Sequence, residues 1–188
     1  SKLSERLSNE HMLPTFELNK IFEDQNIKGI VIASPAKTHK DLAIKALKND
    51  KDVFIEKPFC LSLPDAQNLS ELATIKNRIL MVGHLLNYHN AFIKMKELIK
   101  NGKIGVLQNI RANRLALGAI RSEESVIYDL SAHDISMILS ITEELPIDVN
   151  VQSIHHHHHN IGPDAINVKL SFSKGVTALI NSDWMCPY

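Results

Sequence analysis

The sequence predicts an α/β protein in two parts: a partial parallel sheet, followed by an α+β domain with a largely antiparallel or mixed sheet. Three observations support this prediction. Short β-branched runs alternate with amphipathic segments up to residue 86, and clustered strand-like runs follow from residue 87. The chain has 188 residues, of which 44% are hydrophobic. That length suffices for one well-packed domain or for incomplete pieces of two, and we expect pieces over 1–86 and 87–188.

The first half has the order strand, helix, strand, helix, strand. Residues 29–33 form a continuous β-branched run, which indicates a strand buried on both faces. The next two strands are expected at residues 52–56 and 79–83. Thr38 and the Ser62-Leu63-Pro64 segment provide the start signals for the intervening helices. This alternation indicates right-handed crossover units on a parallel sheet.

The second half changes character. A helix that contains Phe92 is expected to end at Asn101-Gly102, and a β-rich stretch follows over 106–117. A further helix carries apolar residues on one face, starting with Ile135. Strands are expected over 149–154, 165–172 and 176–182, and Ser173-Lys174-Gly175 is a candidate hairpin turn between the last two.

Charge and hydropathy argue against several classes of protein. Lysine plus arginine number 21 and aspartate plus glutamate number 21, so the basic excess of a nucleic-acid binder is lacking. No apolar run reaches membrane-spanning length, and no signal peptide opens the chain. Cys60 and Cys186 lie far apart, without disulfide or metal-site spacing. We therefore expect a cytoplasmic protein with neither a nucleic-acid nor a membrane partner.

The most informative segment is Val53–Pro58, at the end of the second predicted strand. Ligands of open parallel sheets bind beyond the carboxyl ends of the strands, so Lys57 is expected to direct its ammonium group into a ligand crevice. The alternative is a solvated lysine in a strand-to-helix turn. Either isomer of the Lys57-Pro58 peptide bond is compatible with the sequence.

A second cluster of polar residues spans Tyr128–Asp134 and enters the helix that contains Ile135. Asp129 and His133 are four residues apart, so on a helix they share one face. A histidine in the first turn experiences the positive helix end, which disfavours its protonation, and a neutral imidazole beside a carboxylate suits a general base. The alternative is an N-capping aspartate with a partly buried histidine.

These segments together resemble one family in order and spacing, the glucose–fructose oxidoreductase, inositol dehydrogenase and MocA (Gfo/Idh/MocA) group. The matching motifs are Ala33–His39, Val53–Pro58, Met81–His84, Asn101–Gly105 and Asp129–Asp134. The resemblance covers nearly the whole chain. It implies an incomplete Rossmann-type dinucleotide-binding domain over 1–86 and an incomplete substrate or oligomerisation domain over 87–188. It also implies oxidation of a secondary hydroxyl of a sugar, sugar nucleotide or cyclitol, with NAD or NADP as cofactor.

The resemblance assigns roles to individual residues. Ser34, Pro35 and His39 fall on the adenosine and ribose side of the cofactor, and Glu56 and Lys57 fall at the nicotinamide ribose. The implied catalytic residues are Lys57, Asp129 and His133. His133 would take the hydroxyl proton, Asp129 would orient its ring, and Lys57 would stabilise the developing alkoxide.

The substrate contacts follow from the same resemblance. Arg114 and Arg121 are candidates to pair with a phosphate or carboxylate on a sugar nucleotide; ordinary surface ion pairs are the alternative. Asn87 and Tyr88 are expected to line the crevice.

Two features depart from the family pattern. The seven glycines form no Gly-x-Gly-x-x-Gly loop, which would lie upstream of Ser1, so we expect this chain alone to bind NAD poorly. His155–His159 form a run of imidazoles, to which we assign no metal because a metal site also needs fixed geometry. The alternative functions are a non-catalytic binding protein that kept the fold and a homo-oligomer formed through the second-domain sheet.

Overall fold

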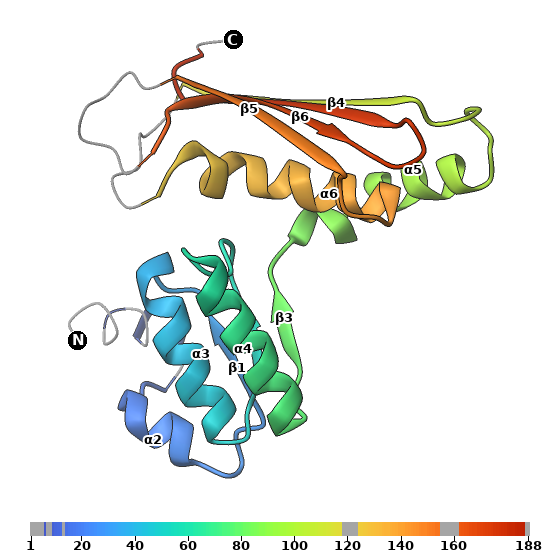
Figure 1. Ribbon diagram of the computed structural model, residues 1–188. Helices are drawn as coiled ribbons and strands as arrows, with labels where there is room; N and C mark the ends of the chain where they lie inside the picture. The colour runs from blue at the N-terminus through green and yellow to red at the C-terminus, as the bar shows by residue number, and fades with distance from the viewer. Residues whose placement is uncertain (1–5, 7–8, 13, 118–123, 155–161, 187–188) are drawn as a thin grey trace.

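The computed structural model describes residues 6, 9–12, 14–117, 124–154 and 162–186, and it contains two separate sheets (Figure 1). The first is parallel, with the order β1 (Gly29–Ile32), β2 (Asp52–Ile55) and β3 (Leu80–Val82). The second has the order β4 (Asn109–Leu115), β7 (Thr177–Asp183), β6 (Ala165–Ser171) and β5 (Asp148–Ile154). Strand β4 pairs parallel with β7, and the other pairs are antiparallel. The predicted fold class is confirmed.

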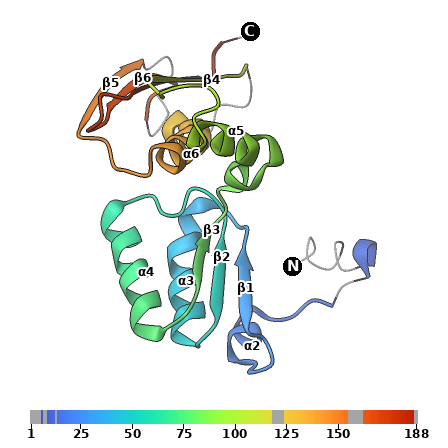
Figure 2. The ribbon, with the colours of Figure 1, turned by 90° about the vertical axis from the view of Figure 1, so that its right-hand side faces the viewer.

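Helices α3 (His39–Lys48) and α4 (Leu63–Lys76) pack on the first sheet, and the short helix α2 (Leu18–Glu23) precedes β1 (Figure 2). Ser62 caps α4 by accepting a hydrogen bond from the Asp65 amide at 3.3 Å, and Asn77 ends it in the left-handed conformation. Leu47, Ile55 and Leu69 are fully buried between these helices and the sheet. Burial of such apolar side chains stabilises this half by roughly 1.5–3 kcal/mol per residue.

The prediction that the first strand is buried on both faces is wrong for the described residues. Val31 is 70% exposed, and it is in register with Phe54, which is in turn in register with Met81. Successive right-handed crossovers that advance in one direction place their helices on the same face of a sheet. Helices α3 and α4 therefore both pack against the face that holds Ile32 and Ile55, and the alternate residues face away.

The second half starts with the 3₁₀ turn η2 (Leu85–Tyr88) and helix α5 (Asn90–Lys100). A π-helical turn, η3 (Ile127–Ser131), leads directly into α6 (Ala132–Thr142). Figure 1 shows α6 beneath the second sheet, on the side that faces the first half. Val126 and Ile138 pack with Ile166 and Ile180 of the sheet in a second apolar core.

Two glycine predictions hold. The chain turns between β6 and β7 with Gly175 at φ +79°, and α5 gives way to Gly102 at φ +65°. Glycine adopts such left-handed backbone without strain, because it has no Cβ.

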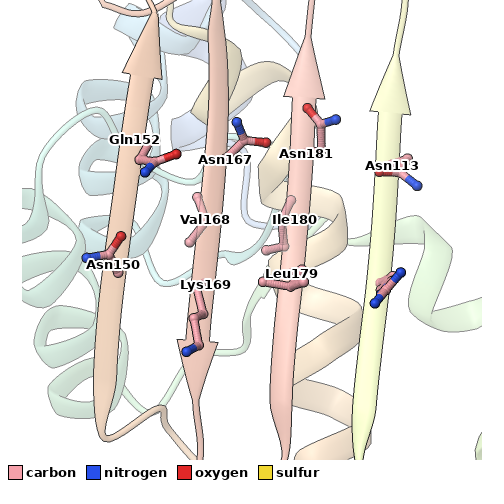
Figure 3. Close-up of a pocket in the computed structure, with 10 residues that line it drawn as sticks. Asn113, Asn150, Gln152, Asn167, Val168, Lys169, Leu179, Ile180 and Asn181 are labelled. Carbon is pink, nitrogen blue, oxygen red and sulfur yellow. The ribbon is translucent and has the colours of Figure 1, made fainter.

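The other face of the second sheet carries an unusual row of amide side chains (Figure 3). The strand register aligns one amide from each strand in this row, which we call the amide row: Gln152, Asn167, Asn181 and Asn113. Arg111 and Lys169 stand in the next row, and these side chains line a shallow hollow. No helix covers this face in the part of the chain that the structure describes (Figure 1).

Within the described residues, no helix has the length and apolar character that a membrane crossing requires.

Candidate active site

The carboxyl ends of the three parallel strands point toward the second half of the chain (Figure 2). Ser34 follows β1, Glu56 and Lys57 follow β2, and Gly83 follows β3. This edge is where open parallel sheets bind their ligands. Here η3 contacts it, and α6 lies on the same side of the second sheet, facing the first half (Figure 1).

Lys57 joins the two halves. Its Nζ donates to the backbone oxygen of Asp129 at 2.8 Å and to Asp129 Oδ1 at 3.0 Å. The two side chains are 19% and 12% exposed, so the alternative of a solvated lysine is excluded. The Lys57-Pro58 peptide bond is cis. An ammonium group has three hydrogens, and among the described residues no third acceptor contacts Nζ.

The second oxygen of Asp129 lies against the core of the second half. Its Oδ2 accepts a hydrogen bond from the indole Nε1 of Trp184 at 3.0 Å. Trp184 directly follows β7 and is 2% exposed. The carboxylate is thus held between an ammonium group and an indole.

His133 is the second residue of α6, so it lies in the first turn of that helix as predicted. The π turn η3 runs directly into α6, and the Asp129 amide already donates to the Ser125 oxygen at 3.0 Å, so helical hydrogen bonding begins before His133. The pKa of His133 is lowered by burial and then by the nearby cations Lys57 and Arg114, against the opposing effect of Asp134.

The Nδ1 atom of the His133 ring is buried and makes no hydrogen bond within the described residues. The two carboxylate oxygens of Asp129 accept hydrogen bonds from Lys57 and Trp184. A π turn adds a residue to the helical repeat, which changes the side-chain directions that i,i+4 spacing predicts.

Three buried polar atoms in this region have no partner in the described residues: Nδ1 of His133, Nδ1 of His84 and Oδ1 of Asn87. His84 lies close enough to His133 for its charge to lower the pKa of that ring, and burial lowers the pKa of His84 itself. Buried polar groups without partners are rare in folded proteins and call for a ligand or ordered water. Together with Lys57, they fit the polar nicotinamide end of a dinucleotide and a hydroxylated substrate.

The three residues predicted on the adenosine side of the cofactor differ from one another in their surroundings. Ser34 Oγ lies 2.6 Å from Thr38 Oγ1, and Pro35 is exposed. His39 is 1% exposed, with Nδ1 2.9 Å from the Pro58 oxygen and Nε2 2.8 Å from the Ser34 oxygen. Because both ring nitrogens are engaged in the interior, the predicted direct contact of His39 with a cofactor is corrected to a structural role.

Glu56 lies beside Gly83 at the same edge of the sheet. A Cβ added to Gly83 would stand 3.1 Å from Glu56 Oε2 and 3.2 Å from Phe54 Cζ. Glycine at position 83 therefore leaves the space that the Glu56 carboxylate occupies.

Arg114 forms an ion pair within the chain. Its Nε and Nη2 donate to Asp134 Oδ2 and Oδ1 at 3.0 and 2.9 Å. The structure therefore favours the ion-pair alternative for Arg114, although Asp134 is buried rather than on the surface. Tyr88 is 63% exposed at the end of η2. Arg121 and His155–His159 lie outside the described residues, and no metal-binding cluster occurs within them.

Three residues of this site were not given a role from the sequence: His84, Asp134 and Trp184. Asp134 directly follows His133 in the sequence, and this position could have suggested a role for Asp134 in the site. The contacts of Trp184 reach Asp129 across most of the second half of the chain, so no local pattern could have indicated them.

Comparison with known proteins follows the same division of the chain. Residues 2–84 match the model of the oxidoreductase family with an NAD-binding Rossmann fold, and residues 92–188 match the GFO/IDH/MocA C-terminal domain. A myo-inositol 2-dehydrogenase of Thermotoga maritima is 30% identical over 67% of this chain and 39% of its own length. A UDP-N-acetylglucosamine 3-dehydrogenase of Acidithiobacillus ferrooxidans is 30% identical over 68% of this chain and 40% of its own length. The chain thus spans about two fifths of these relatives.

Among solved structures, GenD2 from gentamicin A biosynthesis, in complex with NAD, aligns with a TM-score of 0.90 at 21% identity. The alignment covers 100% of this chain and 57% of GenD2. At that identity the likeness shows the fold.

The fold and the site define a class of protein, the two-domain oxidoreductases in which a Rossmann-type NAD-binding part meets an α+β domain. Within that class, the chain belongs to the Gfo/Idh/MocA oxidoreductase family.

Proposed function

We propose that the protein takes part in NAD- or NADP-dependent oxidation of a secondary hydroxyl on a sugar, sugar nucleotide or cyclitol. The observation that carries the proposal is the meeting of Lys57, from the edge of the parallel sheet, with the helix that bears His133. A cation and an uncharged imidazole at one buried edge are what removal of an alcohol proton requires.

The residues divide the chemistry between them. The lowered pKa of His133 keeps its ring neutral at neutral pH, so an unprotonated ring nitrogen takes the hydroxyl proton. The third hydrogen of the Lys57 ammonium group stabilises the negative charge on the oxygen as the carbonyl forms. When bound, the nicotinamide supplies the hydride acceptor that no side chain can provide. Glu56, beside Gly83 at the edge of the sheet, is the residue of this chain that would hold it.

The relatives support the substrate class. One is a myo-inositol 2-dehydrogenase and another a UDP-N-acetylglucosamine 3-dehydrogenase, and both act on polyhydroxylated rings by name. The unpaired His84, Asn87 and His133 atoms match such rings, because a hydroxyl both donates and accepts hydrogen bonds.

The test is an assay of the chain against a panel of inositols, hexoses and UDP-sugars, with formation of the reduced cofactor as the readout. NAD and NADP are supplied at concentrations high enough to offset the weak cofactor binding expected of this chain. Nicotinamide mononucleotide is included as a binding probe for the Lys57 edge, and binding is followed by NMR. Binding of this probe, with oxidation of at least one panel member, is the expected result. If the chain binds neither the probe nor any substrate, the result supports the alternative of a non-catalytic protein that kept the fold.

We also propose that the open face of the second sheet pairs with a second copy of the chain. Amides both donate and accept hydrogen bonds, so the amide row is self-complementary, as an isologous two-fold interface requires. Asn181→Arg would place like charges across such an interface, and we expect it to halve the mass measured by light scattering. Lys94→Glu, on exposed α5, is the matched control; an unchanged mass for Asn181→Arg contradicts the proposal.

A further inference from the structure

Trp184 is the single tryptophan of the chain, and it lies where the second sheet meets the candidate site. Its backbone N–H donates to the Asp164 oxygen at 3.1 Å, and its side chain is 2% exposed within the second apolar core. The indole is therefore fixed by β7 and by the packing around it. Only its Nε1 hydrogen reaches out of that core, to Asp129 Oδ2.

The two carboxylate oxygens of Asp129 have different partners. Oδ2 receives the indole hydrogen at 3.0 Å, and Oδ1 receives the Lys57 ammonium group at 3.0 Å. Lys57 also binds the backbone oxygen of the same residue at 2.8 Å. The indole thus fixes the rotation of the carboxylate, and the carboxylate together with its backbone oxygen fixes the ammonium group.

We infer that Trp184 is a positioning residue for Lys57, which it orients through Asp129. The inference rests on the proposed function for its effect on turnover, whereas the hydrogen-bonded chain itself does not depend on it. An apolar side chain of the same size would fill the core equally well, but it would remove the indole donor from Oδ2 and with it one constraint on the rotation of the carboxylate.

The first test uses the indole N–H signal, which is unambiguous in an NMR spectrum of a protein with one tryptophan. Asp129→Ala removes the acceptor, so we expect the signal to move and its exchange with water to become roughly tenfold faster or more. Phe172→Leu is the matched control, because Phe172 lies in the same core at 2% exposure and donates no side-chain hydrogen bond. An indole signal that is the same in Asp129→Ala and wild type overturns the inference.

The second test compares Trp184→Phe with Phe172→Leu in the oxidation assay. We expect Trp184→Phe to lower kcat by roughly ten- to a hundredfold, the range for a hydrogen bond to a charged group, with little change in KM. Phe172→Leu, by contrast, should keep a kcat near that of the wild type. Equal effects of the two variants on kcat and KM would make Trp184 a packing residue only. If the wild type turns over none of the panel, the proposed function fails, and the indole signal alone decides the role of Trp184.

Discussion

Arg114 and Asp134 face each other through two parallel hydrogen bonds, from Nε at 3.0 Å and from Nη2 at 2.9 Å. Asp134 is almost wholly buried and follows His133 directly, so this pair sets the charge next to the candidate base. The guanidinium lowers the pKa of His133, and the carboxylate opposes it. The pair also raises the pKa of Arg114 itself, through its hydrogen bond with Asp134.

Arg114→Met should therefore alter both stability and titration. It leaves the Asp134 carboxylate buried without its cation, which typically costs about 3–5 kcal/mol in the free energy of unfolding. It also removes a cation while Asp134 remains, so the pKa of His133 should rise toward its ordinary value. Denaturant unfolding and NMR titration of the His133 ring measure the two effects.

Arg114→Lys keeps the charge but loses the two-bond geometry, so it separates the two effects. We expect it to keep most of the lowered pKa of His133 while losing part of the stability. An unchanged His133 titration in Arg114→Met would show that the guanidinium does not act on the ring.

The stability of the fold should fall as the solution is acidified. The pKa values of His84 and His133 are both lowered from 6.5, first of all by burial. The unfolded chain therefore binds protons more readily than the folded one, and the stability that these rings contribute is complete above pH 6.5. It is lost progressively as the pH falls below 6.5 and through the folded pKa values.

Thermal unfolding across this range measures the loss, and His84→Gln, which cannot take up a proton there, should reduce it. His89→Gln is the control, because His89 is exposed and caps α5. A pH dependence that His84→Gln leaves untouched would locate the effect elsewhere.

Lys57→Ala should lower turnover by orders of magnitude while leaving cofactor binding mostly intact, since the substrate oxygen would lose its cation. Steady-state kinetics and the binding of nicotinamide mononucleotide separate the two. Lys94→Ala is the control, because Lys94 forms an exposed ion pair with Glu97 on α5. Turnover near wild type in Lys57→Ala would remove Lys57 from the mechanism.

The buried hydrogen bond between Ser131, the last residue of η3, and Ser182 of β7 connects the helical segment to the second sheet. Ser131 Oγ donates to Ser182 Oγ at 2.8 Å, and both residues are 0% exposed. Ser182→Ala leaves a buried hydroxyl without its acceptor and should cost about 1–3 kcal/mol in the free energy of unfolding. Replacing both serines with alanine should cost less than the sum of the two single changes; strict additivity would mean that the serines do not interact.

The sequence predicted the elements well because their signals are local. The run at 29–33, the cap at Ser62 and the glycine at 175 each specify structure within a few residues, and the structure has strands, helix and turn there. The exposure of Val31 could not be read locally. It depends on which face the following helices cover, and that is set by the order of the strands.

The sequence could predict where a side chain lies when the residue follows a strand, but not where the backbone geometry is irregular. Lys57 lies at the carboxyl edge of β2 as expected. Asp129 lies in a π turn, and its carboxylate contacts Lys57 and Trp184. Spacing of i,i+4 cannot anticipate an extra residue in a helical turn. The roles of His39 and Trp184 depend on partners far along the chain, which only the folded molecule reveals.

The ring of His39 lies between the Ser34 and Pro58 oxygens, so one side chain links the loops that follow two neighbouring strands. A displacement of either loop is transmitted to the other, and the segment that carries Lys57 cannot relax independently of the turn at Ser34 and Pro35. Removing the imidazole would break both contacts, so the two loops would no longer be connected through His39. The position of Lys57 would then depend only on its own hydrogen bonds and on the backbone around it.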